Sequence, residues 1–216
     1  STLQPRLLLA LLLYFGSEVL AWTNPPGRSL LEWILLVPGY LALSAVLLHF
    51  IVRYRVRDLF GALILTGIYS LCAALVLNPA SMLNDLPRTL VTRVMGAHAL
   101  LTAEMFGLFL ALTRSSRRSQ RYLFIGCVVV GLAWGIWVKN WPLEEGFMSP
   151  SLLTMLAYGV GGLLAIAAVL YVGSTQRTRY SVSLQKEQEN SLHDMGLRLS
   201  RRGGLLVAVV FMALLG

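Results

Sequence analysis

Ionisable side chains inside long apolar stretches are the residues of this chain best placed to do chemistry. Glu104 is the foremost, because it stands near the middle of an apolar stretch over residues 91–113. A charged side chain at the centre of a bilayer costs about 2.5–3.5 kcal/mol on insertion scales, so such residues mark proton or ion pathways or are held by protein partners. We expect Glu104 to face protein or an internal cavity, as a protonatable group or as a hydrogen-bonded packing residue.

Arg93 extends this intramembrane polar site toward one end of the same predicted helix. On a period of about 3.6 residues, Arg93, Ala97, Glu104 and Ala111 fall on one face, and the two alanines leave room for a neighbouring helix. Arg93 and Glu104 are about 16 Å apart along the axis, at roughly 1.5 Å per residue. This separation excludes a direct ion pair and predicts a polar track.

His98 is the third member of the polar site and the candidate cofactor ligand. Its neighbours Gly96, Ala97 and Ala99 are small, so a flat macrocycle such as haem or chlorophyll could approach the imidazole. No second ligand stands at a recognisable spacing, and the three histidines are too dispersed for a metal site. The cofactor is therefore unknown, and the alternative is a hydrogen-bonded packing histidine.

The motifs of common enzyme classes are absent from the sequence. It contains no H-E-x-x-H, no G-x-S-x-G, no Walker lysine loop and no G-x-G-x-x-G before a helix. Cys72 and Cys127 lack a C-x-x-C partner and are expected to be buried apolar fillers. The sequence therefore predicts no catalytic residue, and an enzyme is not expected.

The elements that position these residues are predicted from composition. Apolar residues make up 56% of the 216 residues and charged residues 13%, against about 25% charged residues in a soluble domain. Blocks of about twenty apolar residues match the length of a helix that crosses a hydrocarbon core of roughly 30 Å. The blocks cover residues 6–22, 31–52, 59–77, 91–113, 122–141, 151–172 and 203–216.

This pattern predicts an all-α, polytopic transmembrane bundle with six full spans and a partial or truncated seventh. The six-span bundle occupies residues 1–173, and a cytoplasmic amphipathic linker occupies 174–202. Residues 203–216 are too few to span a bilayer, so we expect them to begin a seventh segment of a longer polypeptide. Gly131 and Gly135 form a G-x-x-x-G pattern, which is typical of close helix contact.

The charge layout predicts the orientation. With the N-terminus inside, fourteen Lys and Arg residues fall on the cytoplasmic side and four on the outer side, as the positive-inside rule requires. Glu18, close to the outer end of the first block, is expected to snorkel to the interface. Asp58 follows three arginines and is expected to pair with them.

Partners and location follow from the same charges. The net charge of +8 is explained by topology and by contact with anionic lipid of the inner leaflet. Nucleic acid is excluded as a partner, because no folded basic domain and no interleaved aromatic residues surround the arginines over 114–121. The expected location is the inner (cytoplasmic) membrane of a bacterium.

Three functional hypotheses remain open. The first is a non-catalytic integral membrane subunit that packs through its helices against other subunits of a larger complex. The second is a secondary transporter, or its N-terminal half, in which Glu104 carries protons. The third is a seven-span sensory input module. The order of spans and loops is similar to that of many transporters and sensors, although residues 56–61 match only a fragment of the transporter loop motif.

Overall fold

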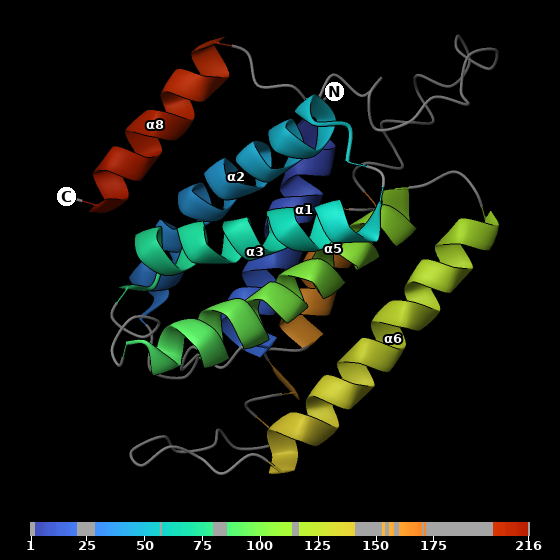
Figure 1. Ribbon diagram of the computed structural model, residues 1–216. Coiled ribbons are helices and arrows are strands. Elements are labelled where there is room, and N and C mark those ends of the chain that lie inside the picture. Colours follow the sequence, from blue (N-terminus) through green and yellow to red (C-terminus); the bar gives the residue numbers. More distant parts are fainter. Residues whose placement is uncertain are drawn as a thin grey trace, which may run out of the picture.

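The computed structural model describes residues 3–20, 29–56, 58–79, 86–113, 117–140, 153, 156–157, 160–169, 171 and 201–215. These residues form helices and the turns that join them, and no strand occurs among them (Figure 1). The predicted all-α class is therefore confirmed. The greater part of the predicted linker, residues 174–200, lies outside the described residues.

The helices follow the predicted apolar blocks, except that the block 151–172 is described only at 153, 156–157, 160–169 and 171. They are α1 (Leu3–Phe15), η1 (Gly16–Leu20), α2 (Leu30–Arg53), α3 (Leu59–Val76), η3 (Leu90–His98), α5 (Ala99–Thr113), α6 (Arg117–Asn140) and α8 (Arg201–Leu215). Two of them, η1 and η3, are π-helical, which means that their backbone hydrogen bonds reach five residues back instead of four. Segments of this kind are often found at functional sites.

Three helical segments within the described residues are long and apolar enough to cross a membrane. They are α2, α3 and the continuous segment Leu90–Thr113, which joins η3 to α5. Two shorter apolar helices, Gln120–Ile136 within α6 and Val160–Val169, fall below that length. These helices are consistent with a membrane protein.

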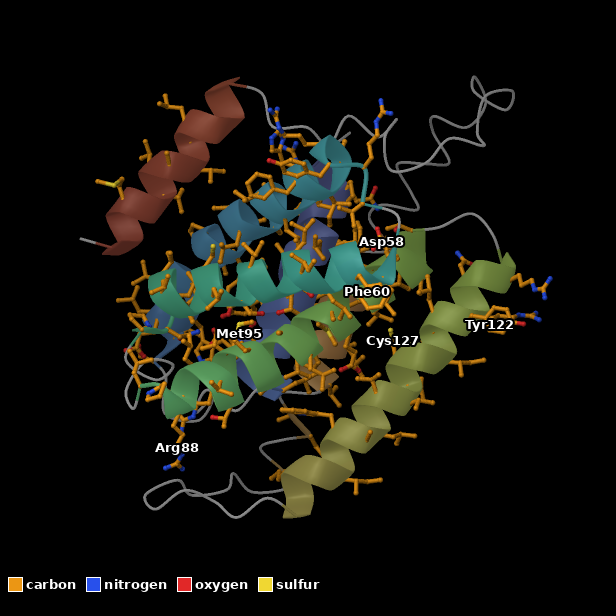
Figure 2. All side chains as sticks on the ribbon, viewed as in Figure 1. Asp58, Phe60, Arg88, Met95, Tyr122 and Cys127 are labelled. Carbon is orange, nitrogen blue, oxygen red and sulfur yellow. The ribbon has the colours of Figure 1, made fainter. Side chains whose placement is uncertain are left out.

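The core is a four-helix arrangement of α1, α2, α3 and α5. Helix α1 packs on α2 and α5, and α3 packs on the same two helices from the other side. Helices α3 and α5 run in opposite directions, as Asp58 and Arg88 at opposite ends of this pair show (Figure 2). Leu9, Leu48 and Phe109 lie completely buried where the helices meet. In membrane proteins, where lipid is as apolar as such side chains, helix association depends on close packing and on hydrogen bonds between helices.

Helices α6 and α8 flank this core. Helix α8 packs on α2, and α6 packs on α5 along the opposite side of the molecule (Figure 1). Close approach of α5 and α6 depends on Gly107, because a Cβ there would stand 3.2 Å from Cys127 Sγ. The indole N–H of Trp134 also donates to the Leu20 carbonyl at 3.2 Å, which ties α6 to the end of η1.

A tight connection joins α2 to α3. The Val56 N–H donates to the Ile51 carbonyl at 3.1 Å across Arg55, whose φ of 51° is left-handed. This is the hydrogen bond of a Schellman helix end, in which glycine usually takes the left-handed position. Asp58 then caps α3, because its Oδ1 accepts from the Gly61 N–H at 2.7 Å. The predicted pairing of Asp58 with arginines overlooked this capping role.

Candidate functional site

The most deeply buried carboxyl group among the described residues belongs to Glu18, in η1. Its side chain is 0% exposed. The Tyr40 hydroxyl donates to Glu18 Oε1 at 2.5 Å, and the Asn78 side-chain amide donates to the same oxygen at 2.8 Å. The three residues come from η1, from the middle of α2 and from the turn after α3. This carboxyl group therefore joins three segments of the core.

The prediction that Glu18 snorkels to the interface is wrong. Tyr40 lies ten residues beyond the start of α2 at Leu30, which is about 15 Å along the helix axis. Because Glu18 contacts Tyr40 there, its carboxyl group lies level with the interior of α2. The sequence position of Glu18 suggested that its carboxyl group would reach water. In the structure that group instead accepts hydrogen bonds from Tyr40 on α2 and from Asn78 in the turn after α3.

Aromatic side chains hold Tyr40 in place. The rings of Tyr14 and Tyr40 meet edge to face, with centroids 5.0 Å apart. Tyr14 also meets the Trp33 ring at 5.6 Å, and its hydroxyl donates to the Trp33 carbonyl at 2.8 Å. Edge-to-face pairs of this kind favour one relative orientation of the rings. The Glu18 cluster, meaning Glu18, Tyr40 and Asn78, is therefore fixed by packing as well as by hydrogen bonds.

Glu104 lies at the contact between α5 and α6 and is half-buried. Its Oε1 stands 2.9 Å from the position that a Cβ on Gly131 would occupy, so glycine leaves the space that the carboxyl group fills. Its Oε2 is shielded from solvent and has no hydrogen-bond partner among the described residues. Glu104 thus faces a neighbouring helix, and one of its oxygens is left without a donor.

A groove of about 720 Å³ runs along this contact and is called the α6 groove below. Its walls are mainly apolar, with Leu63 from α3, Ala103 from α5 and Val130 from α6 among them, and Glu104 lines it as well. Arg118 and Tyr122 lie at its other end, where the Arg118 guanidinium stands 5.9 Å from the centre of the Tyr122 ring. The groove is mainly apolar, and the Glu104 carboxyl group is part of its lining.

Cys127 is part of the same contact. Its Sγ–H donates to the Glu104 backbone carbonyl at 3.5 Å, and Figure 2 shows it on the side of α6 that faces α5. Cys127 is half-buried, whereas Cys72 is exposed on α3. The expectation that both cysteines are buried fillers is therefore wrong for Cys72, because that face of α3 points outward.

Arg93 and His98 do not line the α6 groove with Glu104. Both lie in η3, where the wider π-helical turn changes the angle between successive side chains. The common face predicted for Arg93 and Glu104 from a period of about 3.6 residues therefore stays a prediction. The three predicted site residues occur on one continuous helical segment but do not form one pocket.

His98 is almost completely buried, at 2% exposed. Neither of its ring nitrogens has a hydrogen-bond partner among the described residues. The part of the chain that the structure describes also contains no group of three His, Cys, Asp or Glu that could hold a metal ion. The residues around His98 therefore do not identify a cofactor, and the cofactor role remains a prediction.

No known protein family, curated protein or solved structure matches this chain. Function must be argued from the Glu18 cluster, the α6 groove and the exposed helix faces.

Proposed function

We propose that the chain is a non-catalytic, integral subunit that packs through its helices against other proteins in a larger membrane complex. It crosses the inner membrane six times, with its N-terminus in the cytoplasm. The Glu18 cluster supports a structural role, because a carboxyl group that holds three segments together serves the fold directly.

The observation that carries the proposal is the outer face of α6. Val128 and Leu132 are exposed on it, and a Cβ built on Gly135, one turn further along, would meet no atom of another described segment within 4 Å. These three residues recur at helical spacing and so lie on one face. An apolar face alone would suit lipid equally well, but an open glycine lets another helix backbone approach closely. This combination favours a protein partner.

Photo-crosslinking in native membranes tests the proposal. A photoreactive amino acid at Leu132 should give a discrete adduct with another membrane protein, and Gly135→Leu should weaken that adduct because it fills the close-contact position. The matched control is the same probe at Ile64, which is also exposed and apolar but belongs to α3. Ile64 should react with lipid only. Lipid adducts alone at Leu132 would contradict the subunit function.

A second candidate function, proton-coupled transport, is favoured by the α6 groove and by the unpartnered Oε2 of Glu104. The variant Glu104→Gln separates the two functions, because an amide keeps the shape and most hydrogen bonds but cannot carry a proton. As a subunit, this variant should assemble and give the Leu132 adduct normally. A pH-dependent transport signal in proteoliposomes that disappears with Glu104→Gln would establish transport instead.

A further inference from the structure

We propose that the α6 groove binds a lipophilic monovalent cation, with the Glu104 carboxylate as its counter-ion. The inference does not depend on the subunit function, and it names the substrate class that the second candidate function would use. Size is the first argument. At about 720 Å³ the groove falls within the range of roughly 300–1,000 Å³ that is usual for small-molecule sites.

The chemistry of the lining is the second argument. Apolar side chains such as Leu63, Ala103 and Val130 form the walls, and Glu104 is the acidic residue among the lining residues. Small-molecule sites combine this kind of apolar surface with a few polar groups that orient the ligand. An apolar body with a single positive centre is the ligand that complements such a surface.

The third argument is the unpartnered oxygen. Glu104 Oε2 is shielded from solvent without a hydrogen-bond partner among the described residues, and a polar atom in that state is costly. The Cys127 thiol nearby donates to the Glu104 backbone carbonyl and so does not satisfy the carboxylate. Because Oε2 is itself closed to solvent, a cation in the groove would stabilise the Glu104 carboxylate through its charge and not by contact with Oε2.

Arg118 does not take that role. It lies thirteen residues before Gly131 on α6, which is about 20 Å along the axis and too far for direct contact with the Glu104 carboxylate. Its guanidinium already lies against the Tyr122 ring. An anionic lipid bound at Arg118 would leave Glu104 Oε2 without a partner. The part of the groove that Glu104 lines therefore favours a cation over an anion.

Equilibrium binding to the purified full chain tests this proposal. The chain is placed in nanodiscs of phosphatidylcholine, the probe is tetraphenylphosphonium, and binding to empty nanodiscs is subtracted. Saturable binding is expected, and Glu104→Gln should raise the Kd at least about tenfold, because it removes the negative charge in a site of low dielectric constant. Tetraphenylborate, an anion of the same shape, should not bind saturably.

Two glycines of α6 provide a matched pair of blocking variants. Gly126 lines the groove, and a Cβ built on it would meet no atom of another described segment within 4 Å, so Gly126→Leu should fold and fill the groove. Gly135 is equally open but does not line the groove. Gly126→Leu should abolish saturable binding, and Gly135→Leu should leave it unchanged.

The proposal is overturned if tetraphenylphosphonium does not bind saturably, or if tetraphenylborate binds equally well. It is also overturned if Glu104→Gln or Gly126→Leu leaves the Kd unchanged, or if Gly135→Leu abolishes binding too. The assay uses the isolated chain and the crosslinking uses native membranes. A failure here therefore leaves the subunit function untouched, and the reverse is also true.

Discussion

Glu18 and Glu104 both carry carboxyl groups within apolar helical segments, and the surroundings of the two groups differ. Glu18 receives hydrogen bonds from Tyr40 on α2 and from Asn78 in the turn after α3, and it is completely buried. Glu104 lines an apolar groove with one oxygen unpartnered. Because a buried polar group is costly unless it is satisfied, the first arrangement suits a stable core. The second suits a site that a ligand completes.

The role of Glu18 leads to a prediction about stability. Glu18→Leu leaves the Tyr40 hydroxyl and the Asn78 amide without their acceptor, so unfolding should become easier by about 1–3 kcal/mol, given that hydrogen bonds between membrane helices are worth roughly 0.6–1.7 kcal/mol each. Glu18→Gln should cost less, because its amide oxygen still accepts. Denaturant titration in mixed micelles measures both variants. Equal losses for the two would show that the hydrogen bonds do not matter.

Helices begin and end here at recognisable local structures. Ser29 caps α2 through a reciprocal pair of hydrogen bonds with Glu32, from the Ser29 N–H to Glu32 Oε2 at 2.8 Å and from the Glu32 N–H to Ser29 Oγ at 3.3 Å. Asp58 caps α3 through a single bond, which its side chain accepts from the Gly61 N–H. These caps satisfy backbone groups that the first turn of a helix leaves unpaired. They fix where each helix starts and hence which residues face its neighbours.

The end of α2 leads to a second prediction. Arg55 adopts φ 51°, a conformation that costs a residue with a Cβ about 1–2 kcal/mol and costs glycine nothing. Arg55→Gly should therefore stabilise the folded chain by about 1 kcal/mol, which a higher melting temperature in detergent would show. The control is Tyr54→Gly, one residue earlier at φ −91°, where the same gain is not expected. A gain in both variants, or in neither, would refute this reading of the turn.

At the scale of the whole molecule, basic residues are distributed unequally between the two ends of the helices. Arg53 ends α2, and Arg118 and Arg121 lie in the first turns of α6, so these three precede or follow an expected cytoplasmic connection. Arg88 lies at the other end of the bundle, opposite Asp58 (Figure 2). Positive residues are enriched on the cytoplasmic side of membrane proteins. This distribution supports the proposed orientation.

Labelling of single cysteines tests that orientation. In a chain whose Cys72 and Cys127 are replaced by alanine, Ser149→Cys should react with a membrane-impermeant maleimide in sealed cells. Ser116→Cys should react only after the membrane is opened, because it belongs to an expected cytoplasmic connection. The cysteine-free chain controls for background. Labelling of Ser116→Cys from outside would reverse the topology.

Much of the secondary structure could be predicted from the sequence, because apolar length is a local property. The expected blocks at 31–52, 59–77 and 91–113 match α2, α3 and the segment Leu90–Thr113 within one residue at each end. The Ser29–Glu32 capping pair could also have been found, since its S-x-x-E spacing is visible in the sequence. Exposure of Cys72 could not, because it depends on which face of α3 meets the core.

The sequence by itself determined that this chain is helical and where most of the described helices begin and end, since both follow from the residues within one segment. Only the tertiary structure decided that Tyr40 and Asn78 reach Glu18, and that Gly131 makes room for Glu104. Those partners lie between about 20 and 60 residues away along the chain, on other segments of the fold. The burial and partners of a polar group in a helix bundle depend on which helix faces pack together, and no local sequence pattern specifies that packing.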